Sequence, residues 1–248
     1  MNSSKRFFYV CLTLISIVFA IYGYLWNCDF INFDDNSHVF ENPHVLNGLT
    51  KQSIVWAFTH THGGQWIPLT WMAHMLDVSL FGLEAGGHHM MAVALHALNT
   101  CLLLLALNRL TGAFWKSAAV ALLFAVHPLN VESVAWVAER KNLLSTFFWL
   151  TALTVYAKHA RSPKITTLLG VLGCMIAGLL CKGMLVTLPC TLLLLDFWPL
   201  ERWRTQSWLK LIAEKIPLFA VSFISSLITS RAATASNAIV PVELTSIF

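Results

Sequence analysis

The chain has 248 residues, of which 57% are hydrophobic and only 11% carry a charged side chain. Soluble domains carry roughly 25% charged residues, so this composition excludes an ordinary soluble domain and is typical of a protein that crosses a membrane several times. The net charge of +4 is distributed over the ends of apolar segments, which argues against a nucleic-acid partner.

The N-terminal part predicts one membrane span and a large outer loop. An apolar run covers residues 7–26 after Lys5 and Arg6. It is longer than the core of a signal peptide and lacks a small-residue cleavage site, so we expect an uncleaved span. Residues 27–89 form a polar and aromatic loop with two short amphipathic helices, one capped by Thr50 and one beginning near Pro68. Both are too short to cross the bilayer and should lie in its interface.

Six more apolar segments follow, so the sequence predicts about seven transmembrane helices. The fold class is an all-α integral membrane protein with a single multi-span domain, residues 1–248, and no internal repeat. The expected spans are residues 7–26, 90–110, 114–131, 142–157, 165–181, 184–199 and 216–230.

The basic residues predict the orientation of these spans. With a cytoplasmic N-terminus, 11 of the 16 Lys and Arg residues fall on the cytoplasmic side. Cytoplasmic loops are enriched in Lys and Arg, so this count favours an N-terminus inside and residues 27–89 outside. The eleven are Lys5, Arg6, Arg109, Lys116, Lys158, Arg161, Lys164, Arg202, Arg204, Lys210 and Lys215.

Ionisable residues gather on the predicted outer face, which is the arrangement expected of an active site. Asp34 and Asp35 follow the first span, and the cations Arg140, Lys141 and Lys182 lie at the ends of later spans. Ionisable groups at membrane depth are costly and often functional. Two structural alternatives remain open: a turn or cap for the acidic pair, and snorkelling for the cations. Further polar residues on this face are His88, His89, His127 and Glu132.

Three other sets of residues are interpreted as structural. The six cysteines form no CxxC pair, and most lie inside apolar runs, which indicates packing. The spacing in His60-Thr61-His62 and in His88-His89 is generic, so we predict no metal site. Asp196, at the cytoplasmic end, is assigned to structure.

Four stretches, together with the Phe33-Asp34-Asp35 motif, resemble a known family. The pattern is similar to GT-C membrane glycosyltransferases, and more specifically to the multi-span part of membrane proteins with tetratricopeptide repeats. These include the cadherin-targeting transmembrane O-mannosyltransferases, other protein O-mannosyltransferase-like proteins and bacterial relatives. The stretches are residues 66–71, residues 88–89 with 95–99, residues 124–141, and residues 182–189 with 195–200.

The resemblance implies a membrane glycosyltransferase. It would move mannose or another hexose from a polyprenyl-phosphate donor to a hydroxyl of a protein or glycan acceptor on the outer face. Asp34 would act as the base, Asp35 would help to hold the acceptor, and Arg140, Lys141 and Lys182 would bind the donor phosphate. His127, Glu132, His88 and His89 would support them. No cofactor is required, and a divalent cation is left open.

The resemblance also bears on location and completeness. It implies an integral protein of the bacterial inner membrane with the active-site loop in the periplasm, or of the endoplasmic reticulum in a eukaryote. Related proteins continue into further spans and repeats of about 34 residues, so we expect this chain to correspond to the N-terminal part of a longer design. The alternatives are a transporter or flippase of a lipid-linked sugar, and a truncated, non-catalytic membrane anchor.

Overall fold

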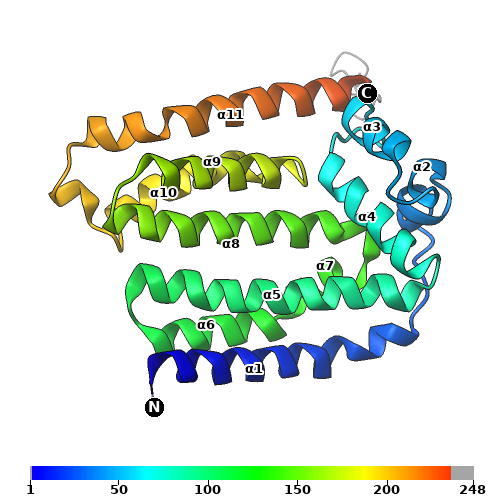
Figure 1. Ribbon diagram of the computed structural model, residues 1–248, viewed down its shortest axis with the longest axis horizontal. Coiled ribbons are helices and arrows are strands. Elements are labelled where there is room, and N and C mark those ends of the chain that lie inside the picture. The colour runs from blue at the N-terminus through cyan, green and yellow to red at the C-terminus, as the bar shows by residue number, and fades with distance from the viewer. Residues whose placement is uncertain (1, 236–248) are drawn as a thin grey trace, which may run out of the picture.

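The computed structural model describes residues 2–235, and this range is built of helices and turns without a β-strand (Figure 1). The α-helices are α1 (Ser3–Tyr22), α2 (Pro43–Leu46), α3 (Lys51–Thr59), α4 (Pro68–Phe81), α5 (Ala85–Thr111), α6 (Phe114–Val126), α7 (Val131–Ala135), α8 (Arg140–Arg161), α9 (Ile165–Leu179), α10 (Leu188–Phe197) and α11 (Trp208–Ala235). Five 3-10 turns and one π turn, η2, join them: η1 (Gly23–Asn27), η2 (Asn36–Phe40), η3 (Pro128–Asn130), η4 (Val137–Glu139), η5 (Gly183–Thr187) and η6 (Arg202–Arg204).

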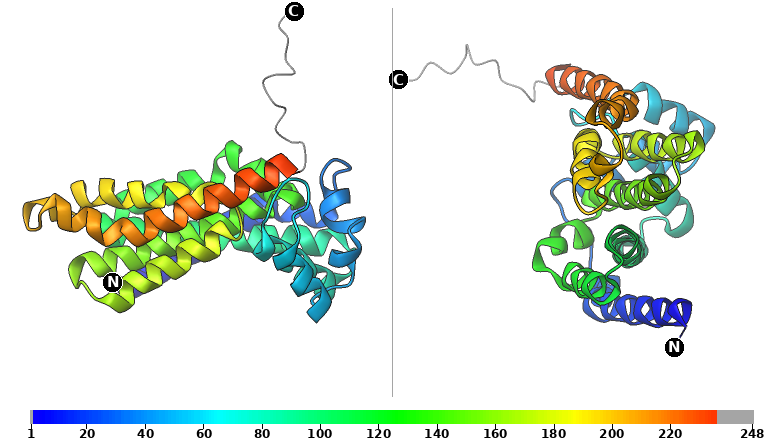
Figure 2. Two further views of the ribbon diagram at one scale, coloured as in Figure 1. Left: turned by 90° about the horizontal axis from the view of Figure 1, so that it is seen from above. Right: turned by 90° about the vertical axis from the view of Figure 1, so that its left-hand side faces the viewer.

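The long helices lie side by side and are stacked nearly in chain order. Helix α1 packs on α5 and α6, α5 packs on α8, α8 packs on α9, and α11 covers η5 and α10 (Figure 1). The short helices α2, α3 and α4 gather at one end of this bundle, which Figure 2 shows from two further sides. The N-terminus and the α10–α11 connection lie at the other end. The two ends of the bundle therefore carry different sets of loops.

Length and composition make the protein an all-α membrane protein. Within the described range, Ser3–Asn27, Ala85–Thr111 and Trp208–Thr234 are each long and apolar enough to cross a bilayer. The pair Phe114–Val126 and Pro128–Ala135, bent by 54°, would make a fourth span. Ile165–Leu179 and Gly183–Phe197 are apolar but shorter, so the seven-span layout stays a prediction.

Two larger apolar cores, one outer core and a smaller cluster between α1, α5 and α6 hold the bundle together. One lies between α1, η1, α5 and the α6–α7 bend, and another between α8, α9, η5, α10 and α11. The third lies among α2, α3 and α4 and includes Val45, Ala57, Ile67, Trp71 and Met75. The segment between α1 and α5 is therefore a packed unit with its own interior.

The two short helices expected in the outer loop are confirmed. Helix α3 begins after Thr50, whose Oγ1 accepts a hydrogen bond of 3.2 Å from the Ser53 amide, and α4 begins at Pro68. Proline is favoured at this first position because its missing N–H would be unpaired there in any case. Helix α4 ends at Gly82, whose φ of 59° suits glycine.

The buried face of α4 differs from its apolar stripe. Leu76 and Leu80 are exposed, whereas His74 and Asp77 are buried together with Trp71. The buried face thus combines apolar residues, Trp71 and Met75, with His74 and Asp77, and the leucines Leu76 and Leu80 face outward. Such an arrangement suits a helix that lies against the membrane interface.

Helix α11 begins at Trp208, earlier than the span predicted at residues 216–230. Ser207 caps it, since its Oγ and its carbonyl oxygen both accept from the Lys210 amide. Residues 208–215, which the sequence analysis assigned to a connection, are therefore helical.

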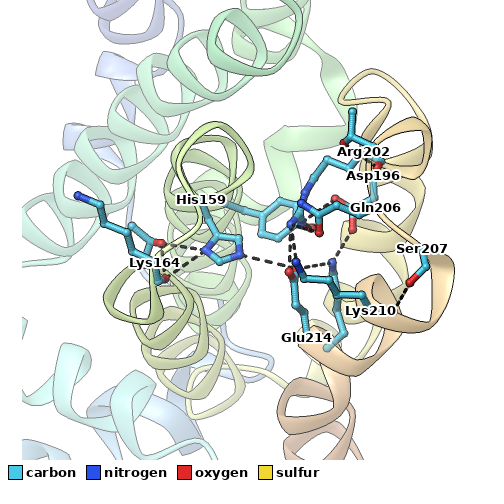
Figure 3. A network of polar contacts seen from close by, with 12 residues as sticks. His159, Lys164, Asp196, Arg202, Gln206, Ser207, Lys210 and Glu214 are labelled. Carbon is cyan, nitrogen blue, oxygen red and sulfur yellow. Dashed lines mark hydrogen bonds and ion pairs between the residues drawn. The ribbon is translucent and has the colours of Figure 1, made fainter.

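Early in α11, Lys215 and Glu214 join a buried network of charges (Figure 3). Asp196 is its centre and is fully buried. Its Oδ1 accepts from the Tyr156 hydroxyl at 2.5 Å and from Arg202 Nη1 at 3.1 Å, and its Oδ2 pairs with Lys215. Glu214 completes the network with an ion pair of 3.0 Å to Arg202. The network joins α8, α10, η6 and α11, which agrees with the structural role expected for Asp196.

Candidate functional site

The acidic pair lies on the segment between η1 and η2, and its two members are in different environments. Asp35 is fully buried, and its Oδ1 accepts from the Ala138 amide at 2.7 Å while Oδ2 accepts from the Ile31 amide at 3.0 Å. Burial raises the pKa of Asp35, although both amide hydrogen bonds oppose that rise. Asp35 therefore ties the acidic segment to η4, and its expected role in holding an acceptor stays a prediction.

Asp34 is half-buried, and its carboxylate makes no hydrogen bond or ion pair with residues 2–235. Its backbone carbonyl accepts from the His38 amide at 2.9 Å, which begins the π turn. Phe33 contacts Trp136, with ring centroids 5.7 Å apart. These contacts fix the backbone of this segment, while the side chain of Asp34 is half-buried.

Histidine and tryptophan rings support this segment from the side of α4. His38 stacks on Trp71 with centroids 5.0 Å apart, and His62 meets the same indole edge-on at 5.4 Å. His62 Nε2 also lies 3.2 Å from the Ser37 carbonyl oxygen. Burial lowers the pKa of His38, which favours its neutral form. The ring cluster fixes the π turn and hence the position of Asp34.

Arg140 is committed to an internal ion pair. Its Nη1 lies 2.5 Å from Asp77 Oδ2, its Nη2 donates to the His88 carbonyl at 2.6 Å, and the residue is 2% exposed. Burial raises the pKa of Asp77, and the guanidinium opposes this rise. Arg140 therefore joins α8 to α4 and α5, and its predicted contact with a phosphate would require that pair to open.

The two lysines meet at a carboxylate that the sequence analysis did not select. Lys141 Nζ lies 2.8 Å from Glu139 Oε1, and Lys182 Nζ lies 3.5 Å from Glu139 Oε2. Asn142 Nδ2 donates to the same Oε2 at 2.5 Å, and Asn142 Oδ1 accepts from Lys182. The Lys182 side chain is 29% exposed, in contrast to the buried Lys141. This cluster of Glu139, Lys141, Asn142 and Lys182 is called the lysine site below.

The four supporting residues take two kinds of position. His88 and His89 are buried at the start of α5, where their Nε2 atoms lie near the carbonyl oxygens of Gly82 (3.0 Å) and Asp29 (3.4 Å). His127 and Glu132 are exposed at the α6–α7 bend. His127 Nδ1 accepts from the Leu129 amide and caps η3. His88 and His89 therefore hold the start of α5 to the preceding loops, and His127 and Glu132 are open to solvent or ligand.

The amino-acid sequence is similar to those of several known proteins. The chain is 29% identical over 200 residues to protein O-mannosyl-transferase Tmtc2 of Drosophila melanogaster, which covers 74% of this chain and 21% of the relative. It is 27% identical over 180 residues to Tmtc1 of the same fly, covering 69% and 21%, and 32% identical over 155 residues to mouse TMTC3, covering 58% and 16%. The chain is therefore similar to proteins named protein O-mannosyl-transferase over part of their length.

The relationship has a defined extent. The chain spans about a fifth of the length of these O-mannosyl-transferases, so it corresponds to one part of them. No family model matches the chain, and no solved structure matches it. The resemblance inferred from the sequence motifs is thereby confirmed at the level of these relatives.

The sequence places Glu139 on the predicted outer face but gives it no role, and it gives no sign of Asp77 as a partner of Arg140. Glu139 directly precedes the Arg140-Lys141 pair that was selected, and an acid beside two cations at membrane depth is a signal for an ion pair. Asp77 is the one carboxylate in α4. Among residues 2–235, no three His, Cys, Asp or Glu side chains are grouped as ligands of a metal ion.

Proposed function

We propose that this chain supplies the membrane part of a glycosyltransferase that moves a sugar from a polyprenyl-phosphate donor to a hydroxyl of a protein acceptor. The names of its relatives support mannose as the sugar and protein as the acceptor. The observation that carries the proposal is the half-buried carboxylate of Asp34, which makes no hydrogen bond or ion pair within residues 2–235, on a backbone segment that the His38 amide holds through the Asp34 carbonyl.

The acidic segment and the lysine site are linked through η4. Asp35, next to Asp34, accepts from the Ala138 amide, and Glu139, next to Ala138, contacts both lysines. The proposed base, Asp34, and the proposed phosphate-binding cation, Lys182, therefore lie on segments that η4 connects. This connection supports a reaction in which a hydroxyl attacks a carbon that bears a phosphate leaving group.

In the proposed reaction, the acceptor oxygen forms a bond to the anomeric carbon of the sugar as the bond from that carbon to the phosphate oxygen breaks. The hydroxyl proton passes to Asp34, and the electron pair of the broken bond leaves with the polyprenyl phosphate. The ammonium of Lys182 stabilises the charge that develops on the departing phosphate. Arg140 keeps its pair with Asp77 and positions α8.

A groove beside the lysine site offers a place for the lipid. It has a volume of about 270 Å³. One wall starts at Ser145, about one turn of α8 after Asn142, and the other starts at Met184, two residues after Lys182. Its lining is largely apolar, as a polyprenyl chain requires. The lining residues are Ser145, Thr146, Trp149, Leu150, Met184 and Leu185.

We also propose that the acidic segment faces the periplasm, or the lumen in a eukaryote, and that the N-terminus is cytoplasmic. The charge bias of the sequence supports this orientation. The geometry agrees with it, since the α2–α4 end of the bundle and the basic α10–α11 connection lie at opposite ends.

Replacement of the base tests the proposal. Asp34→Asn keeps the shape of the side chain and removes proton acceptance, so transfer of labelled mannose from polyprenyl phosphate mannose to a Ser/Thr peptide should fall by roughly 10²–10⁴. Asp29→Asn is the matched control, since Asp29 is an exposed acid on the same segment. Wild-type turnover in a folded Asp34→Asn protein would refute the role of Asp34. Movement of the donor across a vesicle membrane without transfer would favour the transporter alternative.

A further inference from the structure

The charge of the lysine site is set by three side chains. Lys141 and Lys182 contribute two positive charges, and Glu139, within 2.8 Å of one and 3.5 Å of the other, contributes one negative charge. One net positive charge therefore remains. Its accessible part lies on Lys182, because the Lys141 side chain is 5% exposed and that of Glu139 is 11% exposed.

The neighbouring charges leave this balance intact. Arg140 is neutralised by Asp77 at 2.5 Å, and the carboxylate of Asp35 is buried against two backbone amides. Asp34 forms no ion pair with any side chain of residues 2–235 and is half-exposed, so water screens its charge more than that of Glu139. Glu139 is thus the anionic group in direct contact with both lysines.

Lipid-linked sugar donors and their products differ in charge. A lipid phosphate joined to a sugar is a phosphodiester with one negative charge, whereas the free lipid phosphate carries about −1.5 to −2 at neutral pH. A diphosphate-linked sugar carries two negative charges. Leaving an unbalanced charge in a partly buried site is costly, so a site with one net positive charge matches the singly charged donor.

We propose that Glu139 is a specificity-determining residue, which holds the two lysines and limits their net charge to plus one, so that the site favours a singly charged lipid phosphodiester over doubly charged lipid phosphates. The inference rests on the proposed function, because it assumes a lipid-phosphate donor. Because the product, the free lipid phosphate, carries more negative charge than the donor, the same site also favours release of the product.

Two variants separate the charge of Glu139 from its positioning effect. Glu139→Gln keeps one acceptor oxygen for Lys141, replaces the oxygen that accepts from Asn142 by an amide NH2, and raises the net charge of the site to plus two. Glu139→Ala removes the charge and the hydrogen-bond acceptor together. Glu84→Gln is the matched control, because Glu84 is an exposed acid at the same end of the bundle and its loss changes the protein's charge equally.

The experiment measures binding of two probes to the purified full chain in detergent at pH 8, namely polyprenyl phosphate mannose and polyprenyl phosphate. In Glu139→Gln, the affinity for polyprenyl phosphate should rise relative to that for the donor by about 10-fold or more. The reason is that the Coulomb attraction of an added positive charge for a dianion is about twice that for a monoanion. Glu139→Ala should weaken both probes, since the lysines lose their anchor. Glu84→Gln should leave the ratio of affinities unchanged.

A second variant, which lowers the net charge of the site, keeps the test valid if Glu139→Gln does not fold. Lys182→Gln lowers the net charge to zero at a partly exposed position, so it should weaken polyprenyl phosphate more than the donor. An unchanged ratio in folded Glu139→Gln, or an equal shift in Glu84→Gln, overturns the inference while the proposed function stands. If the wild-type chain binds neither probe, the proposed function and this inference both fail.

Discussion

The buried network around Asp196 makes a quantitative prediction about stability. Asp196→Asn preserves the shape of the side chain and removes its negative charge. Lys215, which is fully buried, then loses its principal partner, and Arg202 keeps only Glu214 as an ion-pair partner. We expect α11 to become the weakest part of the bundle, since Lys215 lies in its first third.

The expected size of the effect follows from the burial of both ions. Removing one member of a buried ion pair costs about 3–5 kcal/mol, because the remaining charge is left without compensation. Glu214 still contacts Lys215 at 3.4 Å, so the lower part of this range is expected. A chain of this size loses roughly 2–4 °C in melting temperature per kcal/mol, which gives a decrease of roughly 6–12 °C for about 3 kcal/mol.

Thermal unfolding in detergent, followed by tryptophan fluorescence, measures this decrease. The double variant Asp196→Asn with Lys215→Met removes both charges, and Met is close to Lys in length and is apolar. It should recover much of the lost melting temperature, as expected for coupled partners. A melting temperature of Asp196→Asn equal to that of the wild type would refute the reasoning. So would a double variant that is less stable than either single variant.

Two further predictions concern the candidate site and the orientation. Arg140→Met should lower the free energy of unfolding by about 3–5 kcal/mol, because it leaves Asp77 buried without its cation. Adding Asp77→Asn should restore part of the lost stability in thermal melting. A well-folded Arg140→Met protein with weakened donor binding would instead make Arg140 a phosphate ligand. Single cysteines at Thr61 and Ser162, both exposed, should label from opposite sides of the membrane with an impermeant reagent applied to intact cells. Labelling of both from one side would contradict the proposed orientation.

Local signals in the sequence located the outer helices well. Thr50 and Pro68 mark the starts of α3 and α4 because capping and first-turn preferences depend on the backbone of neighbouring residues alone. The start of α11 was placed too late, at 216. Its first turns carry Lys210, Glu214 and Lys215. Charged residues next to an apolar run predict a loop between spans unless their buried partners are known.

Partners distant in the chain are what the sequence could not provide. The carboxylate of Asp35 accepts from an amide 103 residues away, and Arg140 meets Asp77 across 63 residues. The sequence predicts the same phosphate-binding role for Arg140, Lys141 and Lys182, and favours Lys182 because of its place in a tight hairpin. The structure separates them, since Arg140 is engaged with Asp77, Lys141 is buried against Glu139, and Lys182 is partly exposed.

The start of α4 is fastened to the chain at the end of α9. The Leu69 amide donates to the Leu180 carbonyl at 3.1 Å, and the Thr70 hydroxyl donates to the Cys181 carbonyl at 3.0 Å. Thr70 and Cys181 are 111 positions apart, and ribosomes add about 5–20 residues per second. The start of α4 therefore waits roughly 5–20 s during synthesis before these two hydrogen bonds can form, so the outer helices reach their final position only after α9 has been made.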